Sequence, residues 1–231
     1  MKRILGIVLS IFSLLGATEL PHAITTQVAS VHKGTATTAQ AIPQGMSGIV
    51  IHNYGGGLSA ITHLLVSQGG NRSSIRSYSV VEHDNLPTIK NVVVQGDQVV
   101  FGNFYDNVLV IAPNEQTYVQ VTKGMRKNWI HPDLYAMFLM MNEAHQMTLD
   151  NLKKFAMENQ VGLVMLVDKD QIKVLDPMSG AYLLSLPFQT VGSEAVMSPF
   201  YARFGQMSSG FLGSSDTVAF PEYYRGIRGI K

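Results

Sequence analysis

The stretch NVLVIAPNE, residues 107–115, decides the fold of this chain because it joins a compact apolar strand directly to a helix start. Its first six residues are almost entirely apolar, which is typical of a strand buried on both faces. Pro113, Asn114 and Glu115 then bring a proline, a capping amide and a first-turn acid, which favour the start of a helix. The stretch therefore predicts the beginning of an α/β unit.

Downstream, the sequence predicts that this unit continues to residue 188 with a mixed sheet. We expect helices over 115–127, 132–141 and 149–159, the last capped by Thr148, and strands at 129–131, 162–167, 172–175 and 181–186. The Met137–Met141 run is apolar on all sides. Such a run indicates a helix held between layers or one that lies at a subunit contact.

Upstream, short apolar segments separated by glycine predict a small β-barrel or sandwich over residues 18–105. Strands are expected at 27–31, 35–39, 48–54, 60–67 and 78–82, and the segments 92–94 and 98–101 flank a turn at Gly96-Asp97. Residues 189–231 form an irregular tail rich in Gly, Ser and aromatic residues. The fold class expected from these parts is α+β.

The N-terminus predicts a secretory signal peptide over residues 1–17. Lys2 and Arg3 precede an apolar run from residue 4 to 16, which is too short to span a bilayer as a helix. The chain contains no cysteine, so an exported protein would use neither disulfides nor an N-terminal lipid on cysteine. We expect export to the periplasm, outer membrane or cell surface of a Gram-negative bacterium.

Charge argues against a nucleic-acid partner. Without Lys2 and Arg3 the 17 basic residues fall to 15, against 16 acidic residues, which leaves a formal charge of −1. Nucleic-acid binding needs clustered Lys and Arg. Peripheral membrane association and self-association stay open.

No motif predicts a cofactor, a metal or a catalytic centre. The segment 55–60 has the form of a dinucleotide fingerprint, but residues 61–66 are as compatible with a strand as with a helix, so a hairpin turn is favoured. His52 and His63 would lie near each other across that hairpin, roughly one cross-strand diagonal apart, with His83 as the only candidate for a third metal ligand.

The remaining polar clusters have simpler interpretations. Asp168, Asp170 and Asp176 lack the spacing of a calcium loop and are interpreted as turn formers and edge-strand charges. The Ser208-Ser209 turn lacks the strand and helix that expose a nucleophile, and Ser215-Asp216 is interpreted as a loop. We therefore expect no enzyme.

The end of the sequence offers a candidate partner-binding site. Lys231 is the last residue and comes after the aromatic and basic residues Tyr223, Tyr224 and Arg228. A terminal lysine carries an ammonium and a carboxylate, which the lysine pockets of kringle domains could recognise through opposed charges and aromatic walls. The alternative is a terminal lysine that occurs by chance.

The middle of the chain resembles the N-terminal region of bacterial PgbA-type plasminogen-binding proteins. The resemblance covers about residues 45–190 and rests on positions such as Gly48-Ile49-Val50, Gly96-Asp97-Gln98-Val99, Ala112-Pro113-Asn114-Glu115 and Pro132-Asp133-Leu134. It implies an exported envelope protein that binds host plasminogen without enzymatic activity. In that family capture is tied to C-terminal lysines, a position that Lys231 matches, although the long Lys-rich extension of the family is missing here.

Two functions are therefore expected. The first is a non-catalytic envelope protein that acts as a protein-interaction module toward plasminogen. The second is a structural subunit of a periplasmic or outer-membrane assembly, such as a flagellar-motor accessory ring. The tail, the Met-rich helix and the absence of disulfides motivate this alternative.

Overall fold

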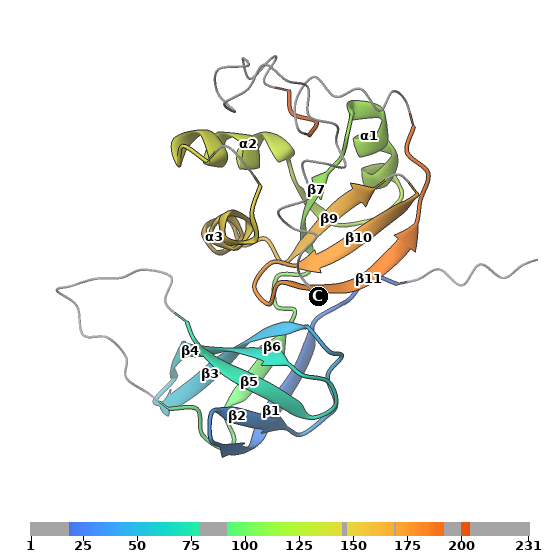
Figure 1. The fold of residues 1–231 in the computed structure, drawn as a ribbon. Coiled ribbons are helices and arrows are strands. Elements are labelled where there is room, and N and C mark those ends of the chain that lie inside the picture. The colour runs from blue at the N-terminus through green and yellow to red at the C-terminus, as the bar shows by residue number, and fades with distance from the viewer. Residues whose placement is uncertain (1–18, 79–91, 145–146, 169, 192–199, 204–231) are drawn as a thin grey trace, which may run out of the picture.

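The computed structural model describes residues 19–78, 92–144, 147–168, 170–191 and 200–203. They form a β-barrel and, beside it, a sheet flanked by helices (Figure 1). The predicted α+β class is confirmed. Within the described residues, no helix is long and apolar enough to cross a membrane.

The N-terminal unit is a closed barrel of six strands in the order β1-β2-β5-β4-β3-β6. Closure satisfies the backbone of every strand edge and removes the exposed edges that an open sandwich would leave. Every pairing in the barrel is antiparallel. The strands are β1 (Ile24–His32), β2 (Thr35–Thr38), β3 (Ser47–Gly55), β4 (Leu58–Ser67), β5 (Arg72–Ser77) and β6 (Gln98–Phe101).

Three details of the sequence prediction need correction. The fifth strand covers Arg72–Ser77 rather than 78–82; Tyr78 lies outside any strand, and residues 79–82 are not among those described. Residues 92–94 flank the turn but form no strand. The first helix ends at Lys123 instead of residue 127, because Gly124 caps it.

The second unit is a five-stranded mixed sheet in the order β11-β10-β9-β7-β8. Strand β7 (Asn107–Ile111) lies between β8 (Asn128–Ile130) and β9 (Leu163–Asp168) and pairs in parallel with both. β10 (Gln171–Asp176) and β11 (Ala181–Pro187) add antiparallel strands on the β9 side. The helices are α1 (Glu115–Lys123), α2 (Pro132–Met141) and α3 (Leu149–Asn159).

The two faces of this sheet belong to two hydrophobic cores. Along β7, Val108 and Val110 face the core shared with α1 and the barrel, whereas Leu109 and Ile111 face the core formed with α2 and α3. All four side chains are fully buried. The apolar run at residues 107–111 is therefore buried on both faces, as expected for a strand between two helical layers.

The barrel interior is continuous with one of these cores. Val50, Val99 and Phe101 of the barrel belong to the same buried cluster as Val108 and Met165 of the sheet. The chain passes from β6 to β7 through Tyr105, which is also buried in that cluster. The two units are thus packed against each other. The division of the chain into separate domains with boundaries at residues 105 and 188 stays a prediction.

Candidate functional site

The strongest polar cluster lies at the carboxyl ends of the parallel strands. Strand β7 is followed by α1 and has β8 on one side, whereas β9, which comes after α2 and α3, lies on its other side. The connection through α1 leads from β7 to β8 on one side, and the connection through α2 and α3 then leads from β8 to β9 on the other side of β7. This reversal makes the edge a topological switch point. In open α/β sheets, ligand sites form at such points.

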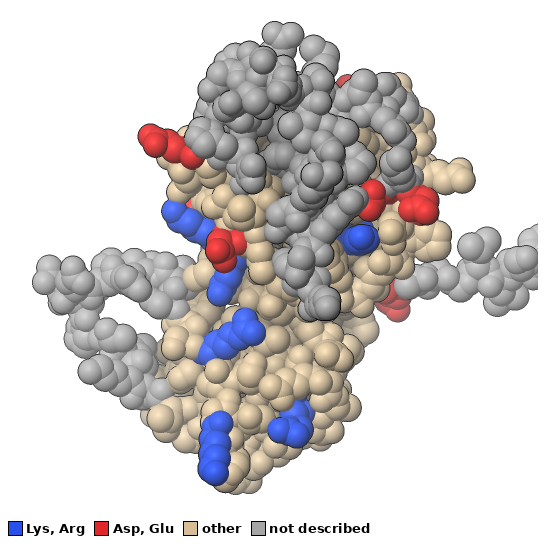
Figure 2. Space-filling view, in the orientation of Figure 1, with Lys and Arg blue, Asp and Glu red and all other residues tan. Residues whose placement is uncertain are grey.

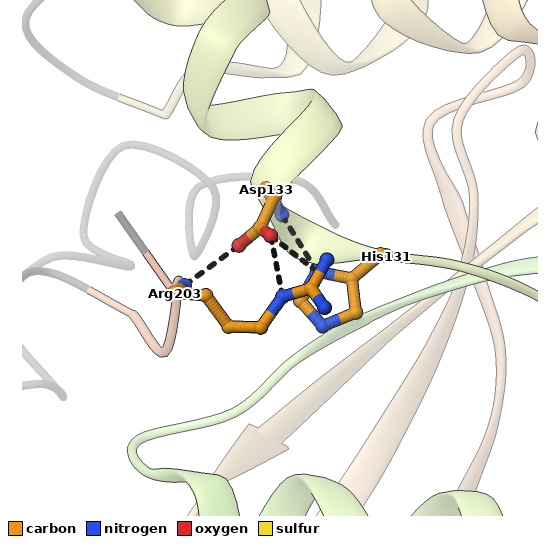
Figure 3. A network of polar contacts seen from close by, with 3 residues as sticks. All are labelled: His131, Asp133 and Arg203. Carbon is orange, nitrogen blue, oxygen red and sulfur yellow. Dashed lines mark hydrogen bonds and ion pairs between the residues drawn. The ribbon is translucent and has the colours of Figure 1, made fainter. Parts of the chain in front are cut away.

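Three residues form an ion-pair network at this edge (Figure 3). Asp133 Oδ2 lies 2.7 Å from Arg203 Nε and 3.1 Å from His131 Nδ1. The Arg203 backbone N–H also donates to Asp133 Oδ1 at 2.7 Å. The carboxylate thus binds the backbone and the side chain of one residue that lies 70 positions further along the chain.

Local sequence explains how two of these residues are placed. His131 directly follows β8 and is the N-cap of α2, with its Nδ1 accepting from the Asp133 backbone N–H at 3.2 Å. Pro132 occupies the first helical turn, where its missing N–H costs nothing. Asp133 then stands in the first turn, where the helix dipole favours an anion.

Burial and charge set the protonation states in the network. Burial lowers the pKa of His131 below its usual 6.5, although the negative charge of Asp133 opposes this shift. The neutral ring keeps Nδ1 as the acceptor that caps α2. Burial works against the ionised form of Asp133, but the hydrogen bonds from Arg203 and the charges of His131 and Arg203 together lower the pKa of this carboxyl. A neutral histidine and a carboxylate therefore coexist at neutral pH.

The same edge is covered by later segments of the chain itself. Tyr201 donates its backbone N–H to the Ala112 carbonyl at 2.8 Å, just after β7. Its ring lies 5.3 Å from that of Tyr118 on α1 and 5.9 Å from that of His131. The Thr117 hydroxyl donates to the Val191 carbonyl at 2.9 Å, beside the start of α1. The arrangement anchors residues 191 and 200–203 at the position where other α/β sheets hold a ligand.

The glycine segment predicted as a hairpin turn is one. Gly55, Gly56 and Gly57 join β3 to β4, and a strand comes next instead of the helix that a dinucleotide site requires.

His52 contacts the carboxylate of Asp97, which sequence analysis did not single out, and in the β3–β4 register His52 lies opposite Ala60 and His63 opposite Val50. His52 Nδ1 lies 2.7 Å from Asp97 Oδ1. Burial lowers the pKa of His63, and the charge of Asp97 opposes this shift. His83 is not among the described residues. Within the described part of the chain, no three His, Cys, Asp or Glu side chains are placed to hold a metal ion.

The position of Asp176 corrects the interpretation of the acidic cluster as charges on an edge strand. It lies at the end of β10, which has a neighbour on both sides, and its side chain is fully buried instead of forming an edge charge. Its Oδ2 accepts from the Ser47 backbone N–H at 2.8 Å and from the Tyr105 hydroxyl at 2.6 Å. Its Oδ1 accepts from the N–H groups of Met178 and Ser179, so it does form the predicted turn as well.

The predicted partner-binding residues fall outside the described part of the chain. These are Lys231, Arg228, Tyr223 and Tyr224. The serines at 208, 209 and 215, which were considered as nucleophile or loop residues, also lie outside it. The residues that sequence analysis missed are Arg203 and Tyr105. Each meets its carboxylate across about 70 residues of chain, and no local pattern signals such a pairing.

Comparison with known proteins gives a family-level match. Residues 23–227 match the family described as "Plasminogen-binding protein pgbA N-terminal". The plasminogen-binding protein PgbA of Helicobacter pylori is 26% identical in strain J99 and 27% in strain 26695, over 156 residues. These matches cover 67% of this chain and 34% of each relative, so the chain spans about a third of their length. No solved structure matches this chain.

Proposed function

This chain belongs to the family of the PgbA N-terminal region, and from this membership we propose that it is an exported, non-catalytic protein-interaction module that binds plasminogen. The observation that carries the proposal is the extent of the family match, which includes both the barrel and the α/β unit. The matched region makes up only 34% of each relative named for plasminogen binding. The proposal therefore takes the shared region as the folded body and assigns the plasminogen contacts to the last residues of this chain.

The polar edge of the sheet supports a non-catalytic role. Asp133 is bonded to Arg203 by two hydrogen bonds, and the neutral His131 caps a helix. A general base would need a free lone pair directed at a substrate. Here the carboxylate and Nδ1 already have partners within the protein.

The same network supports a binding role for the residues that come after it. Arg203 is the last described residue and is held to the body by both its backbone and its side chain. The proposed plasminogen contacts come after this anchor in sequence: Tyr223, Tyr224, Arg228 and Lys231. In this proposal the folded body presents the basic and aromatic residues, and Lys231 supplies the ammonium that a lysine pocket recognises.

The test is plasminogen binding by the full chain, measured by surface plasmon resonance with and without the lysine analogue 6-aminohexanoate. We expect Lys231→Ala to weaken binding by about tenfold, the scale of one lost charge-assisted contact. Lys123→Ala, an exposed lysine at the end of α1, serves as the matched control and should bind like the unaltered chain. Equal binding by both variants would reject the lysine mechanism. No binding by the unaltered chain would reject the function.

A second function is favoured by the surface of α2. This helix buries Phe138 and Leu139 but exposes four large apolar side chains, which are Leu134, Met137, Met140 and Met141. Met141 is 81% exposed. Methionine-rich apolar surfaces commonly mark protein contacts. This observation favours a structural subunit of an envelope assembly, such as a flagellar-motor accessory ring.

Self-association of this chain is the property that distinguishes the second function from plasminogen binding. Sedimentation velocity at rising concentration should show assembly for the unaltered chain and its loss in Leu134→Ser/Met137→Ser. Both substitutions alter exposed side chains, so the melting temperature should change little. A deletion strain with normal motility and intact envelope complexes would count against the structural role.

A further inference from the structure

All but one of the exposed large apolar side chains of the described residues belong to α2 or to the barrel, and the exception is Val191. Eleven large apolar side chains are exposed, four of them on α2. Six others belong to the strands and turns of the barrel: Val31, Tyr54, Leu58, Ile61, Val92 and Val94. Contiguous exposed apolar surface on a folded protein usually marks a site of interaction.

The directions of the strands place these six residues toward one end of the barrel. β1 and β3 both run antiparallel to β6, so they run in the same direction and end at the same side. At that side lie the β1–β2 turn, the β3–β4 turn and residues 92–97, which lead into β6. The opposite end is where Ser47, the first residue of β3, binds Asp176 of the sheet. We call the six residues the distal rim.

The β3–β4 turn carries two of these six residues. Gly55, Gly56 and Gly57 all have positive φ angles, which glycine adopts without strain. A Cβ added to any of them would meet no atom within 4 Å, so the turn stands clear of the rest of the protein. Tyr54 and Leu58 flank the turn and are 46% and 69% exposed. An aromatic and an aliphatic side chain thus flank this tip, and the Tyr54 ring lies edge-on to the His52 ring at 4.7 Å.

Among the described residues, the exposed charged side chains at this end are basic. Lys33 lies in the β1–β2 turn and Arg76 near the end of β5, and both are exposed. Between residues 24 and 101, the one carboxylate among the described residues is Asp97, which is buried and bonded to His52. In Figure 2, Lys and Arg side chains extend over the barrel in the lower part of the view, while most of the acidic side chains in this view lie above it.

We propose that the distal rim binds the surface of an anionic phospholipid bilayer. Tyrosine and aliphatic side chains on an exposed tip can enter the interface between headgroups and acyl chains, where amphipathic rings are favoured. Lys33 and Arg76 beside the tip complement the phosphates of anionic lipids. An apolar tip bordered by cations and free of described exposed carboxylates fits this surface better than it fits a neutral or basic protein.

The absence of cysteine allows a direct test. Ser59 lies beside Leu58 on the exposed start of β4. The single substitution Ser59→Cys allows an environment-sensitive fluorophore to be attached there in the full chain. On vesicles of phosphatidylcholine containing phosphatidylglycerol we expect a blue shift of its emission, reversed by high salt. Asn142→Cys, exposed at the end of α2, is the matched control and should show no shift.

Sedimentation with the same vesicles assigns the contact to residues. Tyr54→Ser/Leu58→Ser should lower the vesicle-bound fraction at least several-fold, and Lys33→Glu should lower it on anionic vesicles. Leu134→Ser/Met137→Ser on α2 should bind as the unaltered chain does. Loss of binding in the α2 variant alone, or no binding to anionic vesicles, overturns the proposal. A shift at residue 59 with soluble polyglutamate and none with vesicles would assign the rim to an acidic protein and overturn it as well.

Discussion

At the scale of single residues, Asp176 is the point where the barrel and the sheet are joined by polar contacts. A buried carboxylate is costly unless its oxygens accept hydrogen bonds. Here four donors surround it, and two of them, the Ser47 N–H and the Tyr105 hydroxyl, come from outside the sheet. Burial and then the adjacent Asp176 charge raise the pKa of Tyr105, which keeps its hydroxyl a donor.

Asp176→Asn should therefore destabilise the protein by about 2–4 kcal/mol, because one acceptor oxygen becomes an NH₂ group that faces other donors. Tyr105→Phe removes a single charge-assisted bond and should cost about 1.5–3 kcal/mol. Urea denaturation measures both. The double variant should be less destabilised than the sum of the single variants, since the two groups share a bond. Asp170→Asn, at an exposed residue, is the control and should change stability by less than about 0.5 kcal/mol.

His131 makes a second prediction at the residue scale. Because its folded pKa lies below the unfolded value of 6.5, the unfolded chain binds the extra proton more readily. Its contribution to stability is thus complete above about pH 6.5 and is lost as the pH falls through the folded pKa. The lowered pKa of Asp133 acts in a separate window, with stability lost below its usual 3.8.

His131→Asn should flatten the fall in melting temperature between about pH 7 and pH 5, because asparagine caps helices well and does not titrate there. His131→Ala separates the two effects: it neither caps nor titrates, so its pH profile should be as flat as that of His131→Asn but lie about 1 kcal/mol lower at every pH. An unchanged slope in His131→Asn would show that other groups, such as His63, whose pKa is also lowered, govern this range.

At the scale of elements, glycines mark where segments approach closely. A Cβ on Gly162 would lie 2.2 Å from the Phe104 carbonyl carbon, at the start of β9 and beside the link between the two units. Gly162→Ala must shift backbone, and we expect a loss of about 2–4 kcal/mol in denaturation experiments. Gly124 has a helical φ of −78°, and a Cβ there would lie at ordinary contact distance, 3.6 and 3.7 Å, from the carbonyl oxygens of Val121 and Gln120. Gly124→Ala should therefore gain about 0.4–1 kcal/mol, and an equal loss in both variants would contradict this explanation.

The elements also show which parts of the fold local sequence patterns can predict. β7, β9 and the three helices were predictable because caps such as Thr148 and Asn114 and apolar periodicity are local signals. β5 was missed because RSSIRS has one large apolar residue and is held in place by its neighbours β2 and β4. At the candidate site, the position of His131 before a proline indicated a helix start. The contact between Asp133 and Arg203 could not be predicted, since it depends on the tertiary fold.

At the scale of the whole molecule, one hydrophobic cluster runs from the barrel interior to the inner face of the sheet. Phe101 and Val50 share it with Val108 and Met165, and the buried Asp176 adds directional bonds across the same junction. Opening the junction would expose apolar surface of both units and leave a buried carboxylate without two of its donors. The barrel and the sheet should therefore stabilise each other.

We accordingly expect the two units to unfold in one cooperative transition. Trp129, the single tryptophan, lies in β8 and reports on the sheet, whereas a fluorophore on Ser59→Cys reports on the barrel. The two probes should give the same denaturant midpoint, as a two-state transition requires. Asp176→Asn should lower both midpoints together, because it weakens the contact that couples the units. Two separate midpoints in the unaltered chain would mean that the barrel and the sheet fold independently and that the shared core does not couple them.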